Sequence, residues 1–265
     1  MQQFIHINLQ FVQMEDLRLD RLTALLEGLS PRVTLSNAPQ GLSLNIIQTA
    51  PSEQSRQSDI PIEKISLLIC PAGRPLDPHL RSDQKCFLRF DVGFDGPMGA
   101  SFLVELSEPI SIKMTDADPS LLQVMTLIAT EMQANRCGRP LFINRAGEIL
   151  LITMMRHLTS HPQQNKGLFH ALSDPRIAKS LVAMHNNPAL PWTLNELANL
   201  AGMSRTSFAY SFKNAMQISP GKYLESIRLA IARQLVRNGI GLKQIATKTG
   251  YASPSTLSRA LSRWN

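Results

Sequence analysis

Cysteine is scarce in this sequence of 265 residues. The three cysteines, Cys70, Cys86 and Cys137, are widely spaced and include no Cys-x-x-Cys pair. This pattern argues against a disulfide framework and against a zinc site built from thiolates. It suits a reducing compartment, so we expect a cytoplasmic protein.

Long hydrophobic runs are lacking as well. The most apolar stretch, residues 149–155, ends at Arg156 and is far shorter than the roughly 20 residues that a membrane-spanning helix needs. The first thirteen residues have no basic start and no sustained apolar run. We therefore expect neither an export signal nor a membrane partner.

The sequence also lacks the usual patterns of catalysis and metal binding. It contains no Gly-x-Ser-x-Gly motif, no phosphate-binding glycine loop and no setting typical of a catalytic cysteine. Only His79 lies in the β-rich region, too few for a metal-binding cupin. His157 and His161 are four residues apart, but no third ligand is near them in sequence, and a cationic histidine suits a helix C-terminus. We expect no enzyme, no metal and no cofactor.

Acidic residues are rare in the C-terminal part of the chain. From Asp174 onward, twelve Lys and Arg accompany only three Asp and Glu, a net charge of +9, whereas the residues before Asp174 carry −2. Such a basic segment binds polyanions by releasing condensed counterions. Charge alone leaves two interpretations open, a nucleic-acid partner and a basic soluble surface.

The pattern between Val33 and Met114 is that of short strands separated by turns. Alternation in 85–92 predicts that Cys86, Leu88, Phe90 and Val92 share one face of a strand. Further strands are predicted at 42–49, 65–70, 102–106 and 110–114. Together they predict a small β-sandwich or barrel that ends near Asp118.

After Asp118 the apolar residues fall at helical spacing, and a second helix is predicted from about Arg145 to Ser160. This second helix is apolar on more than one face, through Ile149, Leu150, Leu151, Ile152, Met154, Met155 and Leu158. Two interpretations stay open: a core helix, or a helix that also pairs with a second subunit.

A self-similar pair of segments follows in the basic part. Five residues of the first segment recur 48 positions later, and three more recur at an offset of 49. The first set is Leu194, Leu197, Ala198, Ala201 and Gly202, which recur as Leu242, Ile245, Ala246, Thr249 and Gly250; Ser204, Phe208 and Phe212 recur as Ser253, Leu257 and Leu261. Each copy predicts a helix, a turn with a positive-φ glycine and a second helix, the pattern of a helix-turn-helix unit.

Capping signals support both units. Thr193 with Glu196 predicts a capping box, and Ser204 predicts the start of the next helix. Ser253-Pro254 supplies the same start in the second unit, and Ser219-Pro220 begins the helix that joins the two. Two units at this spacing in a basic segment indicate DNA binding.

From Asp174 the sequence DPRIAKSLVAMHNNPALPWTLNELANLAGMSRTSFAYSFKNAMQISPGKYLESIRLAIARQLV, followed by IATKTGYASPSTLSRAL, resembles the DNA-binding domain of the AraC family of transcription regulators. Two upstream segments, LRLDRLTALLEGLSPRV and RAGEILLITMMRHL, are similar to the cupin-like sensor domain of one subgroup. The resemblance implies an α+β chain in three parts: a cupin-like β-barrel domain over 1–118, a helical region over 119–168 and a double helix-turn-helix over 174–265.

The resemblance also implies which residues meet DNA. The base-facing residues would be Thr206, Ala209, Tyr210, Pro254, Ser255, Thr256 and Arg259. Among them Arg259 suits guanine O6 and N7, with a phosphate contact as its alternative. The expected phosphate-binding residues are Thr193, Arg205, Lys213, Lys248 and Ser253.

Three function classes remain at this point. The first is a transcription regulator whose N-terminal domain binds a small-molecule effector. The second is a constitutive DNA-binding protein whose N-terminal domain only mediates association, and the third is a cupin enzyme with a DNA-binding tail. The expected partner is double-stranded DNA; RNA polymerase, an unidentified effector and a second copy of the chain stay open.

Overall fold

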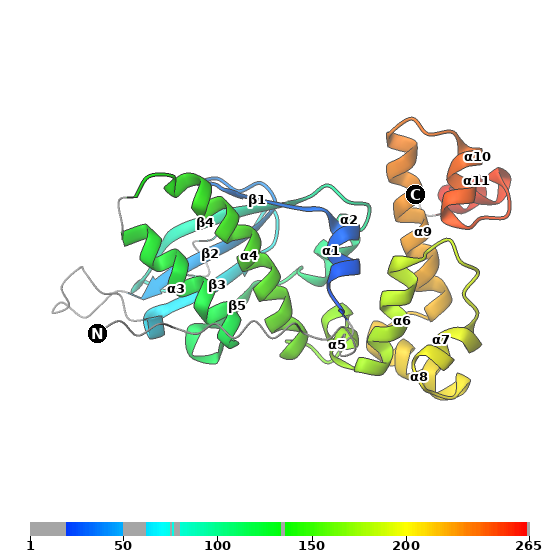
Figure 1. Ribbon diagram of the computed structural model, residues 1–265, viewed down its shortest axis with the longest axis horizontal. Helices are drawn as coiled ribbons and strands as arrows, with labels where there is room; N and C mark the ends of the chain where they lie inside the picture. Colours follow the sequence, from blue (N-terminus) through cyan, green and yellow to red (C-terminus); the bar gives the residue numbers. More distant parts are fainter. Residues whose placement is uncertain (1–19, 50–61, 75, 77–79, 134–135, 264–265) are drawn as a thin grey trace, which may run out of the picture.

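The computed structural model describes residues 20–49, 62–74, 76, 80–133 and 136–263. His79, considered above as a metal ligand, lies outside them. The N-terminal part is built around an antiparallel sheet in the order β1-β4-β2-β3-β5 (Figure 1). Its strands are β1 (Pro31–Leu35), β2 (Leu42–Thr49), β3 (Ile65–Cys70), β4 (Gln84–Phe94) and β5 (Ile110–Lys113). Short helical elements in this part are α1 (Thr23–Leu29), α2 (Gly99–Glu105), η1 (Ile62–Lys64) and η3 (Met114–Asp116).

The predicted α+β class is confirmed, with a sheet-containing N-terminal domain and a helical C-terminal region. Among the described residues the strands form one open sheet, in which β1 pairs only with β4 and β5 only with β3. The strand expected at 102–106 is instead the end of helix α2, in which Phe102 is buried and Val104 is exposed. The other four predicted strands are confirmed.

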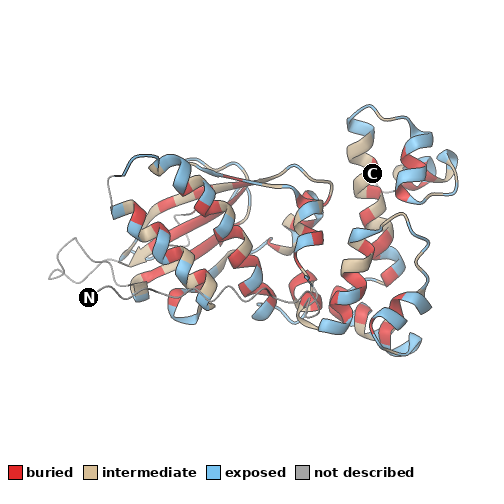
Figure 2. Ribbon diagram, in the orientation of Figure 1, coloured by how far each residue is buried: buried red, intermediate tan, exposed pale blue. Residues whose placement is uncertain are grey.

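One face of the sheet is covered by two helices, α3 (Pro119–Gln133) and α4 (Arg139–Ser160) (Figures 1 and 2). Helix α4 starts six residues before the predicted Arg145. It crosses the sheet closely at Gly147, where a methyl group would lie 2.7 Å from Phe90 Cε1 and 3.0 Å from Val33 Cγ1. Gly147 therefore sets how near the helix comes to β4 and β1.

The opposite face of the sheet is lined by a separate small cluster, Ile47, Leu68, Cys70 and Leu76. Cys86 packs against this cluster, which corrects the prediction that it shares a face with Leu88 and Phe90. The register explains the difference, because Leu88 pairs with Ile46 while Cys86 pairs with Ile47. One extra residue, Phe87, forms a β-bulge that reverses the alternation there.

The C-terminal part is entirely helical in the described residues. Its helices are α5 (Leu168–Ser173), α6 (Pro175–Asn186), α7 (Leu194–Leu200), α8 (Arg205–Met216), α9 (Pro220–Arg237), α10 (Leu242–Thr249) and α11 (Pro254–Arg263). No helix in the described part of the chain is long and apolar enough to cross a bilayer.

The hydrophobic core of the N-terminal part continues into the C-terminal helices. A single buried cluster includes Leu25 of α1, Leu172 of α5, Leu181 of α6 and Phe212 of α8. Polar contacts cross the same boundary, since Arg21 Nη1 donates to Leu172 O at 2.9 Å and Leu168 N donates to a Glu105 carboxylate oxygen at 2.8 Å. The helices α10 and α11 have a core of their own, made of Ala232, Ile245, Ala246 and Leu257.

Candidate nucleic-acid interface

The first helix-turn-helix unit consists of α7 and α8. Helix α7 begins with the predicted capping box: the Glu196 amide donates to Thr193 Oγ1 at 3.2 Å, and the Thr193 amide donates to Glu196 Oε2 at 2.7 Å. Gly202 has φ 63° in the turn. Helix α8 begins at the Ser204 cap and buries Phe208 and Phe212. These predictions of caps, turn and core are confirmed.

The second unit consists of α10 and α11 and is less well anchored. Helix α10 begins at Leu242 after Gly241, which provides no side-chain cap, and Leu242, the counterpart of Leu194, is 41% exposed. Gly250 has the predicted positive φ of 74°. Helix α11 is capped by Ser253, whose Oγ accepts from the Thr256 amide at 3.2 Å. The predicted repeat is therefore confirmed as two helix-turn-helix units, of which the second is less well capped and packed.

Helix α9 joins the units, which lie toward its two ends (Figure 1). Its 18 residues correspond to about 27 Å at a rise of 1.5 Å per residue, about 7 Å less than the roughly 34 Å between successive major-groove segments on one face of DNA. Arg228 on α9 donates to Pro188 O and Leu190 O, each at 2.7 Å. This arginine fixes the loop before α7, against which Gly250 of the second unit packs.

The expected base-facing residues lie on the two second helices of the units. On α8, Thr206 and Tyr210 are exposed, Tyr210 by 75%, and Ala209 is partly exposed. On α11, Pro254, Ser255 and Arg259 are exposed and Thr256 is partly buried. The Ser255 and Thr256 hydroxyls both contact Ser253 Oγ at 2.9 Å. Arg259 makes one weak contact within its helix, from Nε to Ser255 O at 3.4 Å.

The expected phosphate-binding residues are less uniform. Arg205, Lys213 and Lys248 are exposed, with their charges accessible to a polyanion. Thr193 is exposed too, but both its hydroxyl and its amide are engaged by Glu196. A phosphate at the start of α7 would have to compete with that carboxylate, whereas Ser253 at the start of α11 has no acidic neighbour in its own cap.

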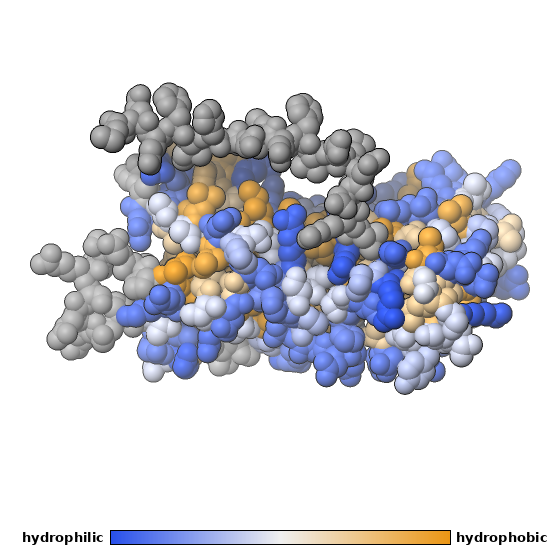
Figure 3. Space-filling view, turned by 60° about the horizontal axis from the view of Figure 1, so that its bottom comes forward, coloured by the Kyte–Doolittle hydropathy of each residue, from blue (hydrophilic) through white to orange (hydrophobic). Residues whose placement is uncertain are grey.

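Figure 3 shows hydrophilic side chains over much of the surface of the C-terminal half, with smaller apolar groups between them. Hydrophobic side chains also reach the surface over the N-terminal half. The large exposed ones on α3 and α4 are Leu127, Leu141, Phe142 and Ile149.

Comparison with known protein families agrees with this architecture. A model of a helix-turn-helix domain matches residues 197–265, and a model of a cupin matches residues 46–160. The chain is 33% identical over 173 residues to the HTH-type transcriptional regulator AlkR of Acinetobacter baylyi, an alignment that covers 64% of this chain and 56% of AlkR. It is 34% identical over 141 residues to a putative AraC-like transcription regulator of Streptomyces lividans, covering 52% of this chain and 46% of that protein.

The chain is thus similar to AraC-like transcription regulators. This chain spans about half the length of these two relatives. The chain is also similar to the crystal structure of a transcriptional regulator with an AraC-type DNA-binding domain from Chromobacterium violaceum, with 27% identity and a TM-score of 0.33 over 35% of this chain and 83% of that one. The matched relatives are transcriptional regulators.

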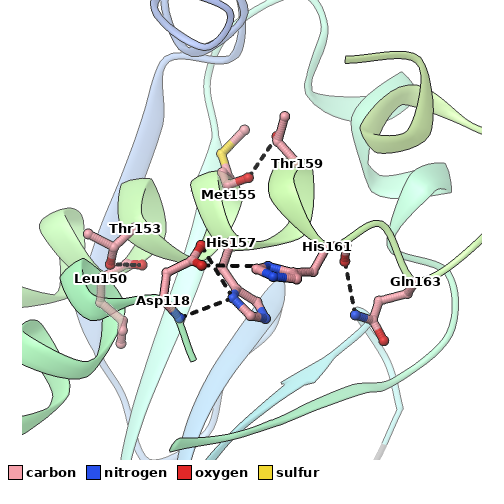
Figure 4. Close-up of polar contacts among 8 residues, drawn as sticks. All are labelled: Asp118, Leu150, Thr153, Met155, His157, Thr159, His161 and Gln163. Atoms are coloured by element: carbon pink, nitrogen blue, oxygen red, sulfur yellow. Dashed lines mark hydrogen bonds and ion pairs between the residues drawn. The ribbon is translucent and has the colours of Figure 1, made fainter. Parts of the chain in front are cut away.

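A second group of polar side chains was missed by sequence reasoning. Asp118, at the start of α3, lies beside His157 and His161 at the end of α4 (Figure 4). The spacing of the two histidines was visible in the sequence, whereas Asp118 is 39 residues away from His157. Antiparallel packing of α3 on α4 brings the third group to the pair.

Proposed function

We propose that this chain is a sequence-specific DNA-binding transcription regulator that places α8 and α11 in successive major-groove segments. The observation that carries the proposal is the repeated unit: two helices with exposed outer faces, each held by a cap and a positive-φ glycine, at the two ends of α9. The net charge of +9 beyond residue 173 supplies the attraction to phosphate.

The proposed base contacts are Thr206, Ala209 and Tyr210 from α8, with Pro254, Ser255, Thr256 and Arg259 from α11. Tyr210 and Arg259 have the largest exposed side chains of the two groups, and neither is buried against the core. The proposed phosphate contacts are Arg205, Lys213, Lys248, Ser253 and Thr193. Of these, Thr193 has the least free hydrogen-bonding capacity, because Glu196 occupies it.

Selection of binding sites from random DNA with the full chain tests the proposal. Recovery of one motif with two elements about one helical turn apart is expected, because both units then contact the same face of the duplex. Recovery of random sequence would overturn it.

Arg259→Ala separates base reading from phosphate binding. If Arg259 contacts a guanine, this variant loses about 1–3 kcal/mol of binding free energy and its preference at one base pair. Lys248→Ala is the matched control, expected to weaken binding to all sequences and to reduce the salt slope by about 1. An Arg259→Ala variant that behaves like Lys248→Ala would assign Arg259 to phosphate.

We further propose that the N-terminal domain acts as a sensor for a small-molecule effector. The support comes from Asn45, a fully buried polar residue on the face of the sheet opposite α3 and α4. Its Nδ2 donates to Leu68 O at 3.0 Å, whereas its Oδ1 has no hydrogen-bond partner among the described residues. A buried acceptor without a partner costs about 1–3 kcal/mol, which a ligand donor would recover.

A thermal-shift screen of small molecules against the full chain tests the sensor role. A ligand that raises the melting temperature and changes DNA affinity supports it by linkage. Turnover of that ligand would favour the enzyme class instead, and stabilisation without any change in DNA affinity would contradict the sensor role.

The exposed apolar residues of α4 favour a homodimer as the functional unit. Of the seven apolar residues of this helix that suggested pairing with a second subunit, five are buried within the chain, but Ile149 is 47% exposed. Leu141, near the start of α4, is 66% exposed. Ile149→Asp should shift a concentration-dependent sedimentation coefficient to the monomer value, whereas Val104→Asp, at an exposed apolar site on α2, should not. A wild-type chain that stays monomeric at high concentration would refute the dimer.

A further inference from the structure

We propose that Asp118, His157 and His161 form a binding site for one divalent transition-metal ion of the kind that imidazole and carboxylate ligands hold, such as Zn²⁺, Co²⁺ or Ni²⁺. Nothing in the DNA-binding proposal depends on this site. In the sequence, α4 ends at Ser160, and His161 precedes α5 and the helices of the two helix-turn-helix units.

The distances between the three groups suit such an ion. His157 Nδ1 lies 3.4 Å from Asp118 Oδ2, and His161 Nδ1 lies 3.6 Å from Asp118 Oδ1. The three ligand atoms all lie within 4.8 Å of one another. Around a tetrahedral Zn²⁺ with bonds of about 2.0–2.1 Å, neighbouring ligand atoms are about 3.3 Å apart. Small side-chain rotations therefore suffice to bring the groups to bonding distance.

Two packed helices hold the groups in place. The i, i+4 spacing brings both imidazoles to one side of the last turn of α4, with their ring centroids 4.7 Å apart and their planes 28° apart. Asp118 immediately precedes Pro119, the first residue of α3, and α3 packs along α4. Figure 4 shows the carboxylate directed at both rings.

The contacts between His157 Nδ1 and Asp118 are long. The Asp118 amide donates to this nitrogen at 3.4 Å, and Asp118 Oδ2 lies 3.4 Å from it. A hydrogen bond of this length is weak, since N–H donors in proteins usually lie about 2.7–3.2 Å from their acceptors. A metal ion bound at Nδ1 would replace these long contacts with a short coordinate bond.

The three groups differ in exposure, which leaves one side of the site open. The His157 side chain is 4% exposed, that of Asp118 is 25% exposed and that of His161 is 54% exposed. Three protein ligands with one open side leave a coordination position for water.

Metal titration of the full chain tests the site. The protein is stripped with a chelator and then titrated with Zn²⁺ against a chromogenic competitor, and with Co²⁺ while its visible absorption is recorded. One ion per chain is expected, with a Co²⁺ spectrum that lacks the intense thiolate charge-transfer band. His161→Ala is the main variant, because its exposed side chain can be removed without opening the core; Asp118→Asn is the second. Each should weaken the affinity by at least about tenfold, since even residues that only support a ligand contribute that much.

His170→Ala is the matched control, since it removes a histidine of α5 outside the cluster and should leave the affinity unchanged. Equal affinity in wild type, His161→Ala and His170→Ala would overturn the proposal. So would a thiolate band, which would place the ion on a cysteine, or the absence of any binding. Circular dichroism confirms that each variant is folded before its affinity is compared.

Discussion

Alanine at Gly250 and at Gly202 should damage the two helix-turn-helix units to very different degrees. The two glycines are equivalent in the repeat and share a positive φ, 74° and 63° respectively. For alanine this left-handed conformation costs about 1–2 kcal/mol at either position. A methyl group at Gly202 meets nothing within 4 Å, whereas one at Gly250 would lie 2.9 Å from Ala189 Cα and closer still to the Ala189 carbonyl oxygen.

The contact between a methyl group at position 250 and Ala189 causes the difference in stability between the two variants. Ala189 belongs to the loop that Arg228 holds through Pro188 O and Leu190 O, so its backbone cannot easily withdraw. Overpacking of this kind costs about 1–3 kcal/mol. Gly202→Ala should thus lose about 1–2 kcal/mol of stability and Gly250→Ala about 2–5 kcal/mol.

Hydrogen exchange followed by mass spectrometry measures the two effects locally, because α10 and α11 have a separate small core and can open on their own. In Gly250→Ala, protection should fall over residues 242–263, and DNA affinity should fall with it. Gly202→Ala should change residues 194–216 by a smaller amount. Equal losses in the two variants would refute the reasoning, since it would mean that the Ala189 contact has no cost.

Two further predictions concern the core and its pH dependence. Gly147→Ala should lower the free energy of unfolding by about 1–2 kcal/mol, because the clash of its methyl group with Phe90 and Val33 outweighs the roughly 1 kcal/mol that alanine gains in helix propensity. Gly221→Ala is the control and should not destabilise the chain, because nothing lies near its Cβ. Urea unfolding compares the two variants, and equal stability would contradict the close crossing of α4 over the sheet. His185 donates to or accepts from Tyr223 Oη at 2.8 Å, and burial lowers its pKa to about 4. Below about pH 6.5 the unfolded chain therefore takes up a proton that the folded chain does not, and stability should fall by about 2 kcal/mol between pH 7 and pH 4.5. His185→Gln should remove this part of the pH dependence, and an unchanged profile in that variant would exclude His185 as its source.

Features that depend on residues close together in the sequence were predicted correctly. Caps such as Thr193 with Glu196 and turns such as Gly202 depend on residues a few positions apart, so the sequence displays them directly. The strand predicted around Phe102 is wrong because so short an apolar run fits two periods. Residues 102, 104 and 106 alternate as in a strand, but Gly99, Phe102 and Leu106 are also spaced as on one face of a helix. These last three are the residues that the structure buries.

Features that depend on pairing across the chain were beyond the sequence. The bulge at Phe87 is visible only from the register of β4 on β2, and it decided the face of Cys86. The group of Asp118 with the two histidines depends on how α3 packs on α4. The exposed faces of α8 and α11 were predictable because their buried counterparts, Phe208 and Leu257, are apolar at helical spacing.

The continuous core between the two parts of the chain limits how they can be exchanged or expressed. A cut between Ser173 and Asp174 passes through a packed interior, since Leu181 of α6 and Leu25 of α1 belong to one buried cluster and the two helices are in contact. A chimera joined there would pair α6 with a foreign α1 and would need the apolar surfaces of both to be redesigned together. A graft that exchanges only residues 242–263 would leave that interior intact and alter just one of the two reading helices.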